Sequence, residues 1–228
     1  MSIFAIVDAD IERRAAVHAA LGEPARLAIV EELALSDRAP SDLARRIGLA
    51  GNLLAHHIDV LQRVGLVERV MSADDRRRRY VRLVHDAARA VTVPRPSHAP
   101  GGRTVFICTH NSARSQVAAV LWRARTGGRA TSAGTHPADR VHPGAVAAAR
   151  RAGLDLTRAR PRALDASDLE ADVVVTVCDR AHEELDVGEA WLHWSIPDPV
   201  RVGTRAAFDA LTELDDRITA IAGHDTQE

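Results

Sequence analysis

Apolar residues recur at helical spacing in four segments of the first 65 residues. We therefore expect helices over residues 10–21, 25–35, 41–47 and 52–64. Ser41, directly after Pro40, is the candidate cap of the third helix. In the fourth, Leu54, Ile58 and Leu61 share one stripe at i, i+4 and i+7, and Gly65 ends the helix.

Two β-prone runs follow these helices. Residues 66–71 and 79–84 are joined by the turn signal Ser72-Ala73-Asp74-Asp75, which predicts a hairpin with a basic second strand. The order of these elements is helices, a short helix–turn–helix and then a β-hairpin. This order is typical of an α+β winged helix-turn-helix domain, in which the hairpin is the wing.

The second half of the chain alternates short apolar runs with helical segments. Strands are expected over residues 103–107 and 173–178, before Thr135, and from Trp191 onward. Helices are expected over residues 115–125 and from His142 to about Gly153. This alternation predicts an α/β fold with a doubly wound, parallel, four-stranded sheet.

A Pro- and Gly-rich stretch separates the two halves. Residues 93–102 contain three prolines and two glycines, which a helix or a central strand does not tolerate. The prediction is a DNA-binding domain over residues 1–92, a linker over 93–102 and a second domain over 103–228, both of ordinary domain size.

Composition excludes several classes of protein. Of 228 residues, 46% are hydrophobic and 27% charged, with a net charge of −1, so binding of a polyanion by bulk charge is not expected. Two cysteines are too few for a secreted disulfide framework. Neither a signal peptide nor an apolar run of about 18 residues is present, which predicts a cytoplasmic protein without a membrane span. No bound cofactor is expected. No metal site is expected either, because His85 and Asp86 alone do not supply four ligands.

Residues 10–90 resemble the ArsR/SmtB repressor family. The likeness is carried by the segment Ala55–Leu61 and by Gly65-Leu66-Val67 after it. It implies binding of double-stranded operator DNA by a homodimer, with one helix in the major groove and the wing near phosphates. The candidate DNA contacts are Asn52, His56, His57, Arg76, Arg77, Arg78, Arg79 and Arg82. Arsenic-sensing members carry cysteines in the segment that corresponds to residues 33–46, and this chain has none there.

A Cys-X5-Arg loop lies between the first strand and helix of the second domain. It reads Cys108-Thr109-His110-Asn111-Ser112-Ala113-Arg114 and is followed by Ser115. Backbone N–H groups of such a loop at a helix N-terminus form a nest for an anion, and the Arg114 guanidinium adds a planar fork for two oxygens. The same positive field favours the thiolate of Cys108, which is the nucleophilic form. Ser115 can donate a hydrogen bond to the sulfur, and Asn111 suits a strained loop conformation.

Residues 103–223 resemble the low-molecular-weight protein tyrosine phosphatases and the arsenate reductases that share their fold. The likeness rests on Cys-X-X-Asn-Ser-X-Arg-Ser after an apolar strand, and on the segments Ser132–Thr135, His142–Val146 and Asp198-Pro199. It implies that Cys108 is the nucleophile, that Arg114 binds the oxyanion and that Asp198 protonates the leaving oxygen.

The choice between arsenate and phosphate rests on differences between those two groups of enzymes. Phosphatases of the family usually have a tyrosine after Asp-Pro, whereas Val200 stands here and Tyr80 is the chain's one tyrosine. Cys178 resembles the second cysteine of thioredoxin-coupled arsenate reductases, but the third is missing from residues 180–185. We therefore expect an arsenate reductase that uses an external thiol, either thioredoxin or mycothiol with mycoredoxin. A buried structural role for Cys178 and a tyrosine phosphatase activity remain the alternatives.

A third hypothesis makes the second domain a sensor. An oxyanion bound in the loop, or oxidation of Cys108, would then control the DNA-binding domain in the same chain, and no turnover would be needed.

Overall fold

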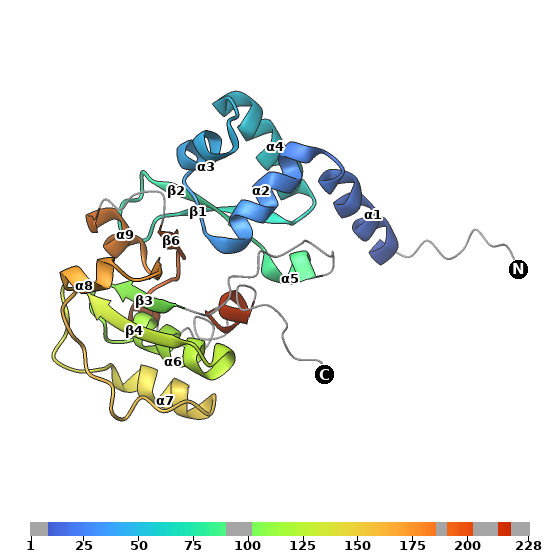
Figure 1. Ribbon diagram of the computed structural model, residues 1–228. Coiled ribbons are helices and arrows are strands. Elements are labelled where there is room, and N and C mark those ends of the chain that lie inside the picture. Colours follow the sequence, from blue (N-terminus) through green and yellow to red (C-terminus); the bar gives the residue numbers. More distant parts are fainter. Residues whose placement is uncertain (1–8, 90–101, 186–190, 203–213, 220–228) are drawn as a thin grey trace, which may run out of the picture. The chain divides into compact units, whose positions relative to one another are not determined.

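The computed structural model describes residues 9–89, 102–185, 191–202 and 214–219 (Figure 1). The chain divides into two compact units, residues 1–70 with 78–95 and residues 71–77 with 96–228. Apart from Gly102, the predicted linker lies outside the described residues. No helix in the described ranges is long and apolar enough to cross a membrane.

The N-terminal half contains the helices and the hairpin that the sequence predicts. The elements are α1 (Ala9–Leu21), α2 (Pro24–Leu35), α3 (Pro40–Ile47), α4 (Gly51–Arg63), β1 (Val67–Met71), β2 (Arg79–Leu83) and α5 (His85–Arg89). The short helix α5 was not predicted. Helix α3, the turn after it and α4 form the helix-turn-helix, and β1 pairs with β2 as the wing.

The core of this half follows the predicted apolar stripe of α4. Leu54, Ile58 and Leu61 are buried against Ile29 and Leu33 of α2. Gly65, with φ 74°, adopts the left-handed conformation that a side chain would disfavour.

The predicted cap of α3 is wrong. Ala39 is the N-cap residue and makes no side-chain hydrogen bond to the helix. Pro40 occupies the first turn, where its missing N–H costs nothing, so the helix begins one residue earlier than expected. The Ser41 hydroxyl contacts Asp42 instead.

The C-terminal half is the predicted parallel α/β fold. Its elements are β3 (Arg103–Cys108), α6 (Arg114–Thr126), β4 (Arg129–Gly134), α7 (Pro143–Arg151), α8 (Ala166–Leu169), β5 (Val173–Thr176), α9 (Asp179–Leu185), β6 (Leu192–His193) and α10 (Pro199–Val202). The four strands are all parallel in the order β4-β3-β5-β6. Three short helices, α8, α9 and α10, were not predicted.

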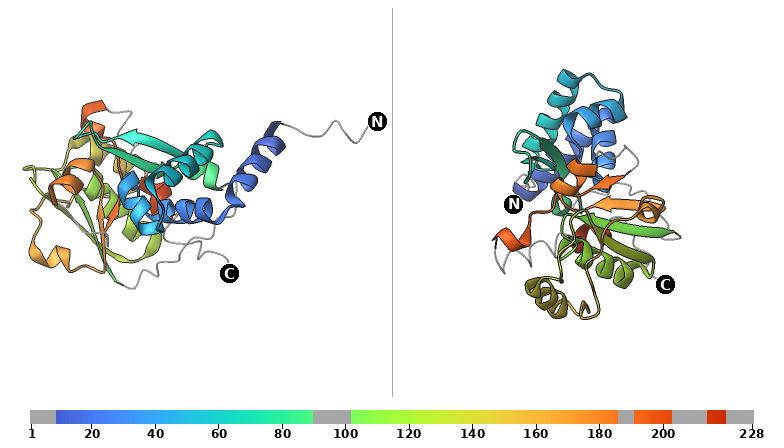
Figure 2. Two further views of the ribbon diagram at one scale, coloured as in Figure 1. Left: turned by 90° about the horizontal axis from the view of Figure 1, so that it is seen from above. Right: turned by 90° about the vertical axis from the view of Figure 1, so that its left-hand side faces the viewer.

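The central strand β3 anchors the core of this fold. Val105, Phe106 and Ile107 are fully buried, as a strand covered on both faces requires. The Phe106 ring lies 5.9 Å from that of Trp122 and 5.8 Å from that of Trp194. Helix α6 packs on β3 and β4, and α9 packs on β3 and β5 from the other side of the sheet (Figures 1 and 2).

The strand order brings the candidate chemistry to one edge of the sheet. Cys108 ends β3, Gly134 ends β4, and Cys178 follows β5 by two residues. Because the strands are parallel, their carboxyl ends meet, and this is the edge at which open α/β sheets bind ligands.

A buried carboxylate fixes the connection between α7 and α8. Asp168 is 1% exposed and accepts two hydrogen bonds from the Arg162 guanidinium, at 2.7 and 2.6 Å. Burial by itself would raise the pKa of Asp168, but the hydrogen bond and charge of Arg162 hold it below its ordinary value of 3.8.

Asp168→Asn is expected to destabilise the protein at pH 7 by about 1–3 kcal/mol, a moderate amount because the Arg162 side chain is 39% exposed. Because the pKa of Asp168 is lower in the folded protein than in the unfolded chain, the ionised carboxylate stabilises the fold at a pH above the unfolded-state pKa. This stabilisation is lost as the pH falls below 3.8. Urea unfolding at pH 7 and at pH 3 should therefore show a difference from wild type that shrinks in acid. Asp139→Asn, at an exposed position, is the control. An equal difference at both pH values would contradict this account.

Candidate active site

The loop after β3 turns its carbonyl groups outward. Thr135 N, His136 N, Ala138 N and His142 N donate to the carbonyls of Cys108, Thr109, His110 and Ser112, at 2.8 to 3.2 Å. In a trans peptide the N–H points opposite to the C=O. The N–H groups of residues 109, 110, 111 and 113 therefore point to the inner side of the loop, as an anion nest requires.

The Cys108 sulfur receives hydrogen bonds from this inner side. Asn111 N donates to Sγ at 3.2 Å, and Ser115 Oγ lies 2.9 Å from Sγ. Asn111 Nδ2 donates to Ser115 Oγ at 2.8 Å, which leaves the Ser115 hydroxyl proton available for the sulfur. Ser115 thus lies where the sequence analysis expected a donor to the thiolate.

Asn111 is the strained residue of the loop. Its φ of 47° is positive, and among the described residues it is the one non-glycine with this feature. Gln116 Nε2 donates to its backbone O at 3.1 Å and to its Oδ1 at 3.0 Å, and Arg162 N donates to Oδ1 at 3.0 Å. Sequence reasoning missed Gln116, because a glutamine in a helix carries no signal of its buried partners.

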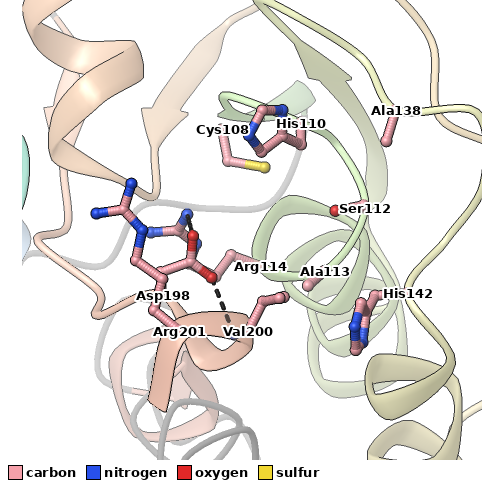
Figure 3. Close-up of a pocket in the computed structure, with 10 residues that line it drawn as sticks. All are labelled: Cys108, His110, Ser112, Ala113, Arg114, Ala138, His142, Asp198, Val200 and Arg201. Atoms are coloured by element: carbon pink, nitrogen blue, oxygen red, sulfur yellow. Dashed lines mark hydrogen bonds and ion pairs between the residues drawn. The ribbon is translucent and has the colours of Figure 1, made fainter. Parts of the chain in front are cut away.

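The loop opens into a pocket of about 410 Å³ (Figure 3). Its lining residues are Cys108, His110, Ser112, Ala113, Arg114, Ala138, His142, Asp198, Val200 and Arg201. This volume lies in the range of roughly 300–1,000 Å³ for small-molecule sites. His142, Ala138 and Arg201 were not predicted as site residues, because they come from segments remote from the loop in sequence. None of the ten lining residues is Phe, Tyr or Trp.

Arg114 and Asp198 form an ion pair in the lining of the pocket. Arg114 Nη2 lies 3.3 Å from Asp198 Oδ2, and Arg114 Nη1 donates to Ile196 O at 2.9 Å. Val200 N donates to Asp198 Oδ1 at 2.9 Å, so the residue after Asp-Pro fixes the carboxylate through its backbone (Figure 3). The fold thus brings together Cys108, Arg114 and Asp198, the three residues predicted for the first chemical step.

Cys178 lies behind the loop, and the residue is 1% exposed. Its Sγ is 3.4 Å from Thr109 Oγ1. Burial raises the pKa of the Cys178 thiol, and the Cys108 charge adds to that rise, while the Arg114 charge and the Thr109 hydrogen bond oppose it. Both cysteines are buried, and neither forms a disulfide.

The predicted DNA-contact residues fall into two groups. Asn52 and His56 on α4, and Arg76, Arg77, Arg78 and Arg79 near the hairpin turn, are exposed. Arg77 pairs with Asp75 at 3.1 Å, and the half-buried Arg82 pairs with Glu68 at 2.7 Å.

His57 does not have the exposed position expected for a base contact. Its residue is 7% exposed, and Nδ1 lies 3.5 Å from Glu23 Oε2 without a hydrogen bond to any described residue. Position 57 follows Leu54 by three residues and precedes Leu61 by four, so helical spacing turns it to the buried stripe.

Comparison with known proteins assigns the two halves of the chain. Residues 103–224 match the family model of the low molecular weight phosphotyrosine protein phosphatases, and the chain belongs to that family. Residues 21–70 match a model described as a helix-turn-helix domain. The N-terminal half is thus a helix-turn-helix domain fused to a phosphatase-family domain.

Relatives within the family include arsenate reductases. The arsenate reductase of Bacillus licheniformis is 33% identical over 102 residues, which cover 42% of this chain and 73% of that protein. The arsenate reductase of Brevibacillus brevis is 35% identical over 101 residues, which cover 41% of this chain and 74% of that protein. Among solved structures, a low molecular weight protein tyrosine phosphatase from T. tengcongensis has a TM-score of 0.49 at 22% identity, covering 52% of this chain and 95% of that chain.

Gly134→Ala is expected to damage the loop. A Cβ at position 134 would lie 2.9 Å from both Asn111 Cβ and Thr109 O, so the loop must shift. We expect alkylation of Cys108 by iodoacetamide, and turnover of an aryl phosphate where measurable, to fall about 10- to 100-fold. Gly51→Ala, which meets no atom within 4 Å, is the matched control. Wild-type rates in Gly134→Ala would show that the loop tolerates displacement.

Proposed function

We propose that this protein is a DNA-binding transcriptional regulator fused to a thiol-dependent arsenate reductase. The observation that carries the enzymatic half is the pairing of a nucleophile loop with a second buried thiol. Cys108 lies under the pocket with Arg114 and Asp198, and Cys178 lies 3.4 Å from the loop residue Thr109. The arsenate reductases among its relatives support this assignment.

In the first step the Cys108 thiolate attacks arsenic of arsenate bound by the loop. An S–As bond forms and the As–OH bond of hydrogen arsenate breaks, and the departing hydroxyl takes a proton from Asp198 and leaves as water. Arg114 and the inward N–H groups neutralise the charge on the remaining oxygens. The positions of Ser115 and Asn111, both hydrogen-bonded to Cys108 Sγ, support the thiolate as the attacking form.

In the second step the Cys178 thiol loses its proton as its sulfur attacks Cys108 Sγ. An S–S bond forms, the S–As bond breaks, and its electron pair stays on arsenic, which is reduced from As(V) to As(III). The proton of the Cys178 thiol goes to the departing arsenite. The two thiols are thereby oxidised to a disulfide, which an external thiol must reduce. With two cysteines in the whole chain, no internal third thiol can do this. Thioredoxin or mycothiol with mycoredoxin is the proposed source.

A phosphatase activity is the second candidate, because Cys108, Arg114 and Asp198 would serve phosphate equally well. The pocket lining weighs against phosphotyrosine. It has no Phe, Tyr or Trp to stack on a substrate ring, and Val200 stands after Asp198-Pro199.

The assay that tests the enzymatic proposal compares the two reactions on one preparation of the full chain. Arsenite formation is measured with thioredoxin and, separately, with mycothiol plus mycoredoxin, against hydrolysis of an aryl phosphate. We expect arsenite formation with at least one thiol system, lost in both Cys108→Ser and Cys178→Ser. Fast aryl-phosphate hydrolysis without arsenite would favour the phosphatase. Neither activity, with oxyanion-dependent DNA binding, would favour the sensor.

The regulatory half rests on the helix-turn-helix and its wing. The exposed residues Asn52 and His56 lie near the start of α4, where a recognition helix contacts base edges, and the arginines lie where a wing contacts phosphates. Binding as a homodimer is part of this proposal.

Replacing Arg76 and Arg79 together by alanine is expected to weaken binding to a mixed-sequence 30-base-pair duplex and to reduce the salt slope of log K by about 2. Both residues are exposed. Fluorescence anisotropy over a salt series measures the slope. Arg158→Ala, an exposed arginine of the phosphatase-family domain, should leave it unchanged. An unchanged slope in the double variant would remove the wing from the interface.

A further inference from the structure

The turn that carries Cys178 is tied on both sides to one histidine ring. Thr176, two residues before Cys178, has Oγ1 2.9 Å from Nδ1 of His193. Asp179, one residue after Cys178, has Oδ1 3.1 Å from Nε2 of the same ring. All three residues are buried, and His193 belongs to β6, which pairs with β5. One imidazole therefore bridges Thr176 and Asp179, which flank the turn of the second thiol.

A second histidine fixes the orientation of this ring. His182 of α9 stacks on His193, with ring centroids 4.0 Å apart and planes 12° from parallel. Its Nδ1 lies 3.1 Å from the same Thr176 hydroxyl. The His193 ring is thus held by a hydrogen bond at each nitrogen and by a stacked neighbour on its face.

The protons of this cluster have a consistent arrangement. A hydroxyl donates one proton, and His193 is the shortest of the three contacts of Thr176 Oγ1, at 2.9 Å against 3.1 Å for His182 and 3.3 Å for Leu192 O. If Thr176 donates to His193 Nδ1, then His193 Nε2–H donates to Asp179 and His182 Nδ1–H donates to Thr176. In this assignment the Asp179 carboxylate is the final acceptor of the chain of hydrogen bonds.

The surroundings of Asp179 favour its carboxylate form. Burial by itself would raise the pKa of Asp179, but its hydrogen bonds, that from His193 foremost, hold it below its ordinary value. A buried carboxylate needs such donors, since leaving it without a partner is costly. The hydrogen bond between Asp179 and His193 is therefore a strong restraint on the start of α9.

We propose that His193 is a positioning residue for Cys178, holding its turn so that the thiol is aligned with the sulfur of Cys108. The inference rests on the proposed function, in which Cys178 attacks the Cys108–arsenic adduct. A backbone hydrogen bond ties the Cys178 turn to the Cys108 loop. Val177 N donates to Ile107 O at 2.7 Å, one residue before Cys108. Attack on a divalent sulfur requires alignment, and a displacement of about 1 Å can slow a reaction about 100-fold.

The clearest test uses a matched pair of substitutions at Thr176. Thr176→Val keeps the shape but removes the hydroxyl, and Thr176→Ser restores it. The backbone hydrogen bond from Trp194 N to Thr176 O, 2.8 Å, is kept in both. Two rates are measured on each full-length variant: formation of the Cys108–Cys178 disulfide after mixing with arsenate, and alkylation of Cys108 by iodoacetamide without arsenate.

Disulfide formation should slow about 10- to 100-fold in Thr176→Val, while alkylation of Cys108 stays within about twofold of wild type. Thr176→Ser should form the disulfide at close to the wild-type rate. His193→Gln is the second variant, for use if Thr176→Val does not fold. Its amide can reach one of the two partners of the ring but cannot bridge both, so the same selective slowing is expected.

Three outcomes would overturn the proposal. Wild-type disulfide formation in Thr176→Val would show that the bridge does not position Cys178. Equal loss of both rates would show that the network supports the fold alone. Wild-type arsenite release by Cys178→Ser would reject the proposed function itself, and the positioning role with it. The Cys178→Ser measurement therefore distinguishes a failure of this inference from a failure of the proposed function.

Discussion

The chemistry of this protein depends on one constraint, the outward direction of the carbonyl groups in the Cys108 loop. Backbone donors at residues 135, 136, 138 and 142 hold those carbonyls, and the N–H groups are thereby turned to the inner side. Asn111 adopts a positive φ where the loop turns, which costs conformational free energy. Hydrogen bonds from Gln116 and from the Arg162 backbone offset this cost. The donors can gather around one sulfur because the carbonyls of residues 108, 109, 110 and 112 have hydrogen-bond partners elsewhere.

The two thiols have opposite environments, and this difference suits two different tasks. Cys108 faces the pocket and receives hydrogen bonds from Asn111 N and from the neighbouring Ser115 hydroxyl. Cys178 is enclosed, and burial raises its pKa, so it rests as a thiol. A buried, protonated thiol is less reactive towards oxidants than an exposed thiolate. Cys178 would therefore avoid oxidation until the Cys108–arsenic adduct has formed. The buried ring of His193 restrains the backbone on both sides of Cys178 by contacting Thr176 and Asp179.

Local patterns predicted much of the fold and the centre of the site. The apolar stripe of α4, the glycine at its end and the unbroken apolar strand β3 are short-range signals, and the structure follows them. The loop residues could be named because Cys-X5-Arg is contiguous in sequence. His142 and Arg201 could not be named, because they reach the pocket from segments far from the loop in sequence. Gln116 could not be named, because its buried hydrogen bonds to Asn111 depend on the folded shape of the loop. His57 was misplaced since its polarity suggested the surface, whereas its helical position puts it on the buried stripe.

The central claim is that Cys108 and Cys178 together supply the two electrons that reduce arsenate. Its most direct test is a single turnover of the fully reduced protein, with excess arsenate and no external thiol. The account predicts one arsenite per chain and, in the same sample, an intact-mass loss of two hydrogens with a Cys108–Cys178 linkage in the peptide map. Free thiols with no arsenite, or arsenite formed without that linkage, would contradict it.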